Sequence, residues 1–376
     1  LSDNEQPDYF DCLYLDFITK KYKTHHKTKW PMKFDFVIGN PPYQDDTVGV
    51  QKNFMSPVYD KFMDATYNVS NKVELVTPAR FLFDAGSTSS TWNKKMLNDD
   101  HFKVLSYEPD CKRIFQNTEI KGGVAISYRD KDKSFGSVGV FTPFEELNHI
   151  VHKIKSQNKD GKTLTDVAIS RTSYRLTDTM HKDNPNAIKF LSKGHPYDMS
   201  TNIFELLPFI FHDIKPNDGR QYIGILGREN NERIYKYIRR DYVNNVVNLD
   251  FYKAILSKAS GTGAFGELIS SPIVGSPGTA STETFLSIGK FKTEKEAVHL
   301  VDYIKSKFAR SLLGVMKVTQ DITPAKFKYV PLQDFTSSSD IDWSKSIHEI
   351  DLQLYDKYGL TEDERNFIET HVKEME

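Results

Sequence analysis

A short stretch, Asn40-Pro41-Pro42-Tyr43, brings together groups that could hold a flat amine. It follows an apolar run, FDFVIG (34–39), whose residues favour a β-strand. Proline fixes φ, has no amide hydrogen and keeps the preceding residue extended, so we expect the carbonyl oxygens of this loop to stay outside any strand ladder. With the side-chain oxygen of Asn40, they offer two acceptors beside the ring of Tyr43. Two acceptors and a flat ring suit an exocyclic amine on a planar ring, such as the amino group of adenine.

The elements around this stretch alternate between strands and helices. The patterns predict strands at 12–18, 34–39, 72–78, 102–109, 122–130 and 136–141, and helices at 56–69, 91–100 and 141–157. Apolar strands separated by helices favour a mostly parallel, doubly wound α/β sheet. Such sheets bind ligands at the carboxyl ends of their strands, which is where the Asn40–Tyr43 stretch lies.

The second half of the chain has a different character. Beyond about residue 160, short strands alternate with loops rich in Gly, Ser and Pro. Two basic segments, 230–243 and 294–317, are predicted to be helical, as is the tail from Trp343. Gly359 is placed to end one helix of the tail. Thr361 and Glu364 are then predicted to form the capping box of the next helix.

Composition narrows the class of protein. The 376 residues predict two or three domains and a sizeable core. The net charge of −1 gives no global positive field, so a DNA-binding surface would be a local patch. Two cysteines, Cys12 and Cys111, exclude a disulfide framework and a Cys-rich zinc site, and suit the cytoplasm. We found no signal peptide and no apolar run of roughly 18 residues, so we expect no membrane association.

The NPPY stretch resembles motif IV of the S-adenosylmethionine-dependent amino-methyltransferases, above all the DNA adenine-N6 methyltransferases. YLDFI (14–18) resembles their motif III, which implies that Asp16 contacts the adenine amine of the cofactor and that Phe17 lines its pocket. RIFQNTEIKGGVAISY (113–128) resembles motif VIII, which implies that Phe115 packs on a flipped-out base. The resemblance implies a partial Rossmann-like methyltransferase core.

The resemblance also implies a mechanism in which the target adenine is flipped out of the duplex. Tyr43 and Phe115 would sandwich the base, while the Asn40 side chain and the Pro41 carbonyl accept the two amine hydrogens. This would point the nitrogen lone pair at the methyl sulfonium of S-adenosylmethionine, so positioning and electrostatics would supply the catalysis without a metal. The implied catalytic residues are Asn40, Pro41, Pro42, Tyr43 and Phe115, and the implied cofactor residues are Asp16, Phe17 and Asn40.

The second half is similar to the target-recognition region of large restriction–modification methylases, including type IIG enzymes. The implied partner is double-stranded DNA, and the implied domains are a catalytic portion (1–148), a mixed α/β recognition domain (149–335) and a helical tail (336–376). Candidate DNA contacts are Arg171, Arg175, Arg228, Arg233, Arg239, Arg240, Lys305, Lys307 and Arg310. Asn230, Asn231 and Gln320 have side chains that can read adenine edges.

A glycine-rich motif I, which would hold the methionine end of the cofactor, is not found before Asn40. Only 39 residues precede it, and a βαβ unit alone takes about 30 or more. The run SKASGTGAFGE (257–267) offers Gly261 and Gly263 for a permuted arrangement, but the Pro- and Gly-broken sequence after it favours a flexible loop of the recognition domain. We therefore expect a fragment without motif I that is inactive alone, and whose further partner is its own N-terminal half or a nuclease.

Three alternatives stay open. The same chemistry could act on protein glutamine or RNA guanine, although the long segment after residue 150 favours DNA recognition. The chain could instead be a non-catalytic DNA-recognition module, which cofactor binding would distinguish. A nuclease would need an Asp…Glu-x-Lys cluster, and we found no convincing one in the sequence.

Overall fold

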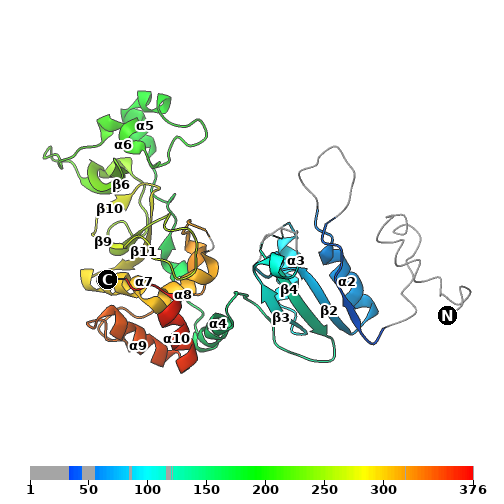
Figure 1. Ribbon diagram of the computed structural model, residues 1–376. Coiled ribbons are helices and arrows are strands. Elements are labelled where there is room, and N and C mark those ends of the chain that lie inside the picture. Colours follow the sequence, from blue (N-terminus) through cyan, green and yellow to red (C-terminus); the bar gives the residue numbers. More distant parts are fainter. Residues whose placement is uncertain are drawn as a thin grey trace, which may run out of the picture. The chain divides into compact units, whose positions relative to one another are not determined.

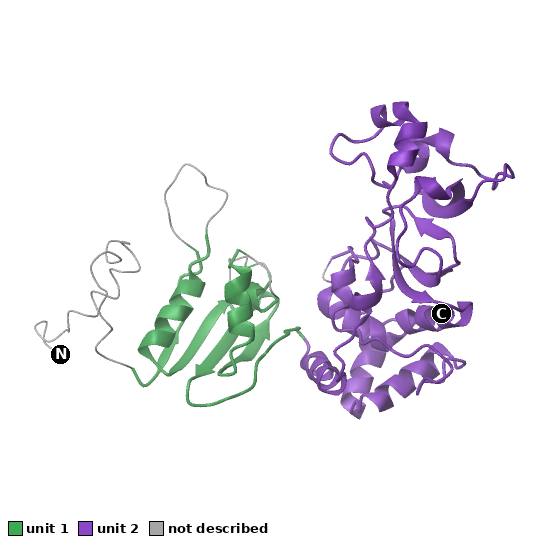
Figure 2. Ribbon diagram, turned by 180° about the vertical axis from the view of Figure 1, so that it is seen from behind, with its two compact units in different colours: residues 1–143 green, residues 144–376 purple. Residues whose placement is uncertain are grey.

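The computed structural model describes residues 34–44, 56–83, 87–115, 120, 122–317 and 319–375. The chain divides into two compact units, residues 1–143 and 144–376 (Figures 1 and 2). The predicted strand 12–18, with Asp16 and Phe17, lies outside the described residues. The predicted domain boundary at 148–149 falls within α4 (Glu145–Gln157), the first helix of unit 2.

Unit 1 is built on a mixed four-stranded sheet. Its elements are β1 (Val37–Gly39), α2 (Tyr59–Val69), β2 (Lys72–Pro78), η2 (Arg80–Phe83), α3 (Ser90–Leu97), β3 (Phe102–Glu108), η3 (Cys111–Arg113) and β4 (Val124–Asp130). The strand order is β1-β2-β4-β3. The pair β1–β2 is parallel, whereas β2–β4 and β3–β4 are antiparallel.

The prediction of a mostly parallel sheet is therefore wrong for the described strands. Parallel neighbours need a crossover connection, and α2 supplies one between β1 and β2. Strand β4 instead lies between β2 and β3 and runs antiparallel to both. The predicted strand 136–141 is also wrong, because Gly136 and Gly139 have φ values of +78° and +61°, outside the extended region.

The core of unit 1 forms where β2 meets the helices. Alternate residues of β2, including Val73 and Leu75, are buried, as the strand pattern predicts. The rings of Phe81 and Trp92 lie 5.2 Å apart, and Phe102 packs against Phe81. Burying one such ring stabilises the fold by about 1.5–3 kcal/mol. Val37 of β1 and Tyr43 pack against this cluster, which holds the loop after β1 in place.

Unit 2 contains two sheets and most of the helices. Besides α4, its helices are α5 (Asp178–Asp183), α6 (Ile203–Leu206), α7 (Glu294–Lys305), α8 (Lys307–Met316), α9 (Ile347–Lys357) and α10 (Glu362–His371). Its strands are β5 (Ala168–Ile169), β6 (Tyr222–Glu229), β7 (Glu232–Arg239), β8 (Tyr252–Ser257), β9 (Ile273–Gly275), β10 (Thr279–Ser281) and β11 (Phe285–Phe291). Short 3₁₀ turns are η4 (Leu164–Val167), η5 (Pro185–Lys189), η6 (Pro208–Ile210), η7 (Arg240–Tyr242) and η8 (Pro324–Phe327).

The two sheets of unit 2 have the orders β10-β6-β7 and β5-β11-β8-β9. Figure 1 shows α5 and α6 beside the first sheet, and α7–α10 gathered with α4 at the other end of the unit. Helix α7 packs on β8, β9 and β11, while α9 and α10 contact α8. The predicted tail 336–376 is thus packed into unit 2.

Unit 2 corrects two of the predictions made from sequence and confirms two others. The predicted helix 230–243 is wrong, because these residues contain the turn and strand β7 of a hairpin. Residues 294–317 form two helices, because Ser306 has extended ψ and caps α8 through the amide of Ala309. Gly359, with φ +59°, and the capping box of α10 are confirmed.

Candidate functional site

The loop that follows β1 has two hydrogen-bond acceptors to which no group of the described residues donates. Asn40 is exposed and Pro41 is half-buried. Within the described part of the chain, no hydrogen bond reaches the side-chain oxygen of Asn40 or the carbonyl oxygen of Pro41. The loop is held farther along, where the amide of Val58 donates to the carbonyl of Tyr43 at 3.1 Å. The backbone is therefore fixed while two acceptors remain available to a ligand.

Tyr43 has a half-buried ring and a hydroxyl with no hydrogen-bond partner in the described structure. Burial raises the pKa of Tyr43 to about 12, and the nearby side chain of Asn40 opposes this rise. In the described structure no hydrogen bond of standard geometry joins the Asn40 side chain to the Tyr43 hydroxyl.

Phe115 comes from a distant segment to the same place. Its ring lies 6.4 Å from that of Tyr43, with 72° between the two planes. The turn η3 fixes this position, because the amide of Phe115 donates to the carbonyl of Cys111 at 2.7 Å. The structure thus brings together two residues that the motifs implicate. Their rings are nearly perpendicular, so a base could lie between them only after one ring reorients.

Two glycines allow the Phe115 segment to approach the end of β2. Gly123 has φ +79°, and a Cβ there would lie 2.5 Å from the carbonyl oxygen of Glu108. Its own carbonyl accepts from the amide of Ala79 at 3.0 Å. Gly122 is similarly close to Arg80, whose Cγ would lie 2.5 Å from an added Cβ. Larger residues would push the segment between β3 and β4 away from the loop after β1.

The glycine-rich loop 260–267 is closed by a carboxylate of its own, that of Glu267. The amides of Thr262 and Gly263 each donate to the Glu267 carboxylate at 2.7 Å, and Lys317 pairs with the same carboxylate. Although burial opposes the change, Lys317 and the two amides lower the pKa of Glu267 to about 2. Because an anion of the protein itself occupies these amides, the loop does not fit the methionine end of S-adenosylmethionine. The predicted cofactor residues Asp16 and Phe17 lie outside the described residues.

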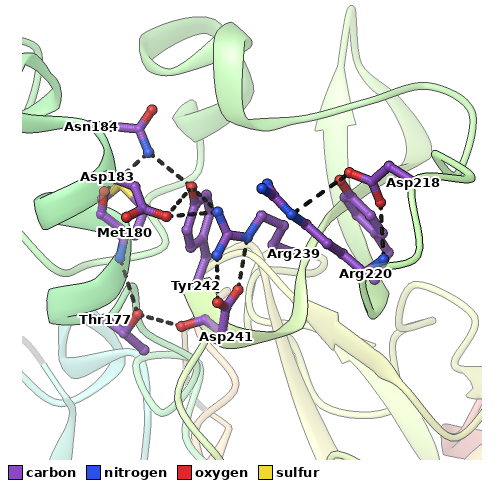
Figure 3. A network of polar contacts seen from close by, with 10 residues as sticks. Thr177, Met180, Asp183, Asn184, Asp218, Arg220, Arg239, Asp241 and Tyr242 are labelled. Atoms are coloured by element: carbon purple, nitrogen blue, oxygen red, sulfur yellow. Dashed lines mark hydrogen bonds and ion pairs between the residues drawn. The ribbon is translucent and has the colours of Figure 1, made fainter.

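Arg239 and Arg240, both candidate DNA contacts, are engaged by acidic side chains. Figure 3 shows Arg239 bonded to Asp183 and Asp241, at 2.6 Å each. Asp241 raises the pKa of Arg239 further, and the guanidinium lies 4.2 Å from the ring centre of Tyr242. Arg240 pairs with Asp250 at 2.7 Å. These two side chains are committed to holding η7 and its neighbours.

The other candidate bases differ in what they contact. Arg171 pairs with Glu283, Arg175 with Asp198, and Lys307 with Glu369. Arg310 is buried at 3% exposure and donates to backbone carbonyls. Lys305 is half-buried and Gln320 is exposed. Arg228 and Arg233 differ from these residues, since both are exposed and lie opposite each other on one hairpin.

The sequence reasoning missed two residues that the structure brings to notice. Glu267 accepts hydrogen bonds inside the glycine loop. The signal available in the sequence was a carboxylate that follows Gly261 and Gly263 by only six and four residues. Tyr235 is 45% exposed beside Arg233. The alternation in ERIYKYIR (232–239), which is typical of a strand, would have placed both side chains on one face.

Among the described residues, none of the helices combines the length and the apolar composition that a membrane span requires. The same residues contain no group of three or more His, Cys, Asp or Glu side chains that could hold a metal ion.

The match to a family model lies in the first third of the chain. Residues 6–115 match the family model of the Eco57I restriction-modification methylases. A curated protein of Mycoplasma pneumoniae (strain ATCC 29342 / M129 / Subtype 1), named an uncharacterized adenine-specific methylase, is 28% identical over 123 residues, which are 32% of this chain and 29% of that protein. This chain therefore spans less than a third of that relative's length.

Among solved structures, the type IIG restriction endonuclease BpuSI aligns with 90% of this chain and 54% of its own, at 8% identity. Its TM-score of 0.32 is too low to establish a common fold. The family match, in contrast, covers both Asn40–Tyr43 and Phe115. The resemblance to restriction–modification adenine methylases is thus confirmed for the segment that carries these residues.

Proposed function

We propose that this chain acts in a DNA methyltransferase that transfers a methyl group to the N6 amine of adenine, as part of a restriction–modification system. The observation that carries the proposal is the meeting of Tyr43 and Phe115 beside the acceptors of Asn40 and Pro41. The family match over residues 6–115 supports it. The unengaged acceptors favour an amine as the ligand, because each amine hydrogen needs one acceptor.

In this proposal the residues of the chain bind and orient the base. The adenine, flipped from the duplex, lies between Tyr43 and Phe115 after their rings reorient. The Asn40 side-chain oxygen and the Pro41 carbonyl accept the two amine hydrogens, which turns the nitrogen lone pair out of the ring. S-adenosylmethionine, when bound, supplies a methyl group on a sulfonium that needs no further activation. The gain comes from positioning and from fixed dipoles.

Methyl transfer from labelled S-adenosylmethionine to duplex DNA, measured with the whole methyltransferase in which this chain acts, tests the assignment. We expect Asn40→Ala to lower the rate by about 100-fold, the usual cost of removing one preorganised hydrogen-bonding group. Gln44→Ala is the matched control, because Gln44 is an exposed amide in the same loop. Equal rates for Asn40→Ala and Gln44→Ala would contradict the role of Asn40.

A second function, a DNA-recognition module without catalysis, is favoured by one observation. The glycine loop 260–267 is occupied by Glu267, so its amides are not open to a cofactor. Calorimetric titration with S-adenosylmethionine, with and without duplex DNA, separates the two functions. One-to-one binding supports the methyltransferase, whereas DNA binding without cofactor binding supports the module.

A further inference from the structure

The tip of the β6–β7 hairpin has a shape that fixes its side chains. Asn230 and Asn231 connect the strands with φ values of +50° and +66°. Positive φ at both central residues is the mark of a type I′ turn, whose twist matches that of the flanking strands. The register is continuous from the Glu229–Glu232 pair at the turn to the Tyr222–Arg239 pair at the far end. The tip is therefore a tight, two-residue connection.

Arg228 and Arg233 lie directly opposite each other next to this turn. Like charges in such a pair destabilise a hairpin, and both side chains are exposed. Arg228 donates to the carbonyl of Asn231 at 2.7 Å, and Arg233 to the carbonyl of Ser271 at 3.0 Å. In the described structure neither guanidinium has a carboxylate within ion-pair distance.

The acidic residues at the turn do not neutralise this pair. Glu229 pairs with Lys236 at 3.3 Å, and Lys236 also reaches Asp213 at 3.1 Å. Glu232 is exposed and lies outside ion-pair distance of both arginines in the part of the chain described. Each guanidinium carries five N–H donors. The Arg233 guanidinium also lies 5.7 Å from the centre of the Phe285 ring, so in the described residues a carbonyl and a ring, but no carboxylate, contact it.

The two faces of the hairpin have different roles. On the rear face, a Cβ on Gly227 would lie 2.3 Å from the ring of Phe204, and Ile234 packs against the buried cluster around Phe204. On the front face, Tyr235 follows Arg233 at the strand repeat of two and is 45% exposed. The front face is also anchored toward the middle of the hairpin, because Leu226, opposite Tyr235, lies in a buried cluster with Ile255 and Phe285. Two arginines and a tyrosine are therefore presented near the tip of a rigid element.

We propose that the tip of this hairpin enters the major groove of the target duplex, where Arg228 and Arg233 each read a guanine. The inference rests on the proposed function, because it takes duplex DNA as the substrate. The major groove admits a two-stranded β-ribbon, and arginine bonds the O6 and N7 of guanine in a bidentate manner. Asn230 and Asn231, at the very tip, are close enough in sequence to bond the neighbouring base edges.

A selection from a randomised duplex pool tests this inference without any cofactor. We expect the wild-type chain to enrich a motif that contains guanine. Arg228→Ala and Arg233→Ala should each lose the preference at one guanine position by about 10- to 100-fold, while the other positions of the motif persist. The matched control is Arg220→Ala, an exposed arginine at the opposite end of the hairpin, which should enrich the wild-type motif.

The lysine variants guard against misfolding and separate base contacts from phosphate contacts. Arg228→Lys and Arg233→Lys keep the charge but lose the bidentate fork, so we expect an unchanged salt dependence and a lost guanine preference. Two results would overturn the inference: variants that keep the motif with uniformly weaker binding, as phosphate contacts produce, or a wild-type chain that enriches no motif. Loss of methyl transfer with the motif retained would instead refute the proposed catalysis alone.

Discussion

Two loops of this protein, 40–43 in unit 1 and 260–267 in unit 2, invite the same interpretation from sequence but differ in structure. Each has a composition that could hold a small ligand through backbone groups. In the second loop, Glu267 accepts from the amides of Thr262 and Gly263, and Lys317 balances its charge. In the first loop, Asn40 and Pro41 keep acceptors that no described donor reaches.

The difference separates polar groups that stabilise the fold from those available to a ligand. A buried polar group that already has its partner contributes to folding, and its loss leaves the partner unsatisfied. An exposed acceptor with no partner contributes little to folding. Changes in loop 260–267 should therefore cost stability, whereas changes in loop 40–43 should cost activity and leave the stability of unit 1 almost unaltered.

The largest effect is expected for Glu267→Ala. This change removes the acceptor of two amides and leaves Lys317, only 4% exposed, with a buried and uncompensated charge. Removing one partner of a buried ion pair costs about 3 kcal/mol or more. Hydrogen exchange of peptides from unit 2, read by mass spectrometry, measures the loss where it occurs.

The change in loop 40–43 to compare with Glu267→Ala is Asn40→Ala. We expect it to change the local free energy of unfolding in unit 1 by less than about 0.5 kcal/mol, as is usual for exposed positions. A destabilisation as large as that of Glu267→Ala would show that Asn40 has a structural partner, and the distinction between the two loops would then fail.

Arginines extend the comparison within one hairpin. Arg239 bonds two carboxylates and lies over the ring of Tyr242, whereas Arg228 at the other end bonds only a carbonyl. Charge-assisted hydrogen bonds contribute about 1.5–3 kcal/mol each, so Arg239→Ala should destabilise unit 2 by roughly 2 kcal/mol. Arg228→Ala should be neutral or slightly stabilising, because it relieves the repulsion with Arg233. Equal urea midpoints for the two variants would refute this difference.

Much of the fold of unit 1 follows from local patterns. Strand 72–78 is predicted with the observed bounds, and helix 56–69 is predicted three residues too early at its start. These segments bury alternate or i, i+4 side chains, which the sequence shows directly. The antiparallel return of β4 between β2 and β3 is a choice among non-local pairings. Local periodicity carries no information on such a choice.

The candidate site divides in the same way. The rigid loop at Asn40–Tyr43 is predictable, because proline restricts its own backbone and that of its neighbour. The ion pair of Arg239 with Asp183 is not predictable, because Asp183 is distant in sequence and reaches Arg239 only through the packing of α5. The hairpin tip resembles a helix in sequence because Ile234 and Ile238 have helical spacing. The Asn230-Asn231 pair, which tolerates positive φ, is the better guide.

Acid should lower the contribution of loop 260–267 to stability over a defined pH range. The pKa of the Glu267 carboxyl is lowered from its ordinary value of 4.5 to about 2 in the folded protein, so its contribution is complete above about pH 4.5 and is lost as the pH falls toward 2. At pH 3.5 the loss should reach roughly 1 kcal/mol. Urea unfolding of the wild type and Glu267→Gln should show a stability difference that shrinks between pH 6 and pH 3.5. A constant difference would mean that the Glu267 charge does not contribute.

A small stabilisation is expected for Tyr43→Phe. The Tyr43 hydroxyl is buried without a hydrogen-bond partner in the described structure, and an unsatisfied buried group costs stability. Removing it while keeping the ring should stabilise the β1–β2 region by about 0.5–1 kcal/mol, which hydrogen exchange of peptides spanning β1 and β2 can detect. Phe81→Leu, at a fully buried ring of the same unit, is the control for a change that must destabilise. If Tyr43→Phe also lowers stability, the hydroxyl has a partner in solution, and loop 40–43 is closed in the same sense as loop 260–267.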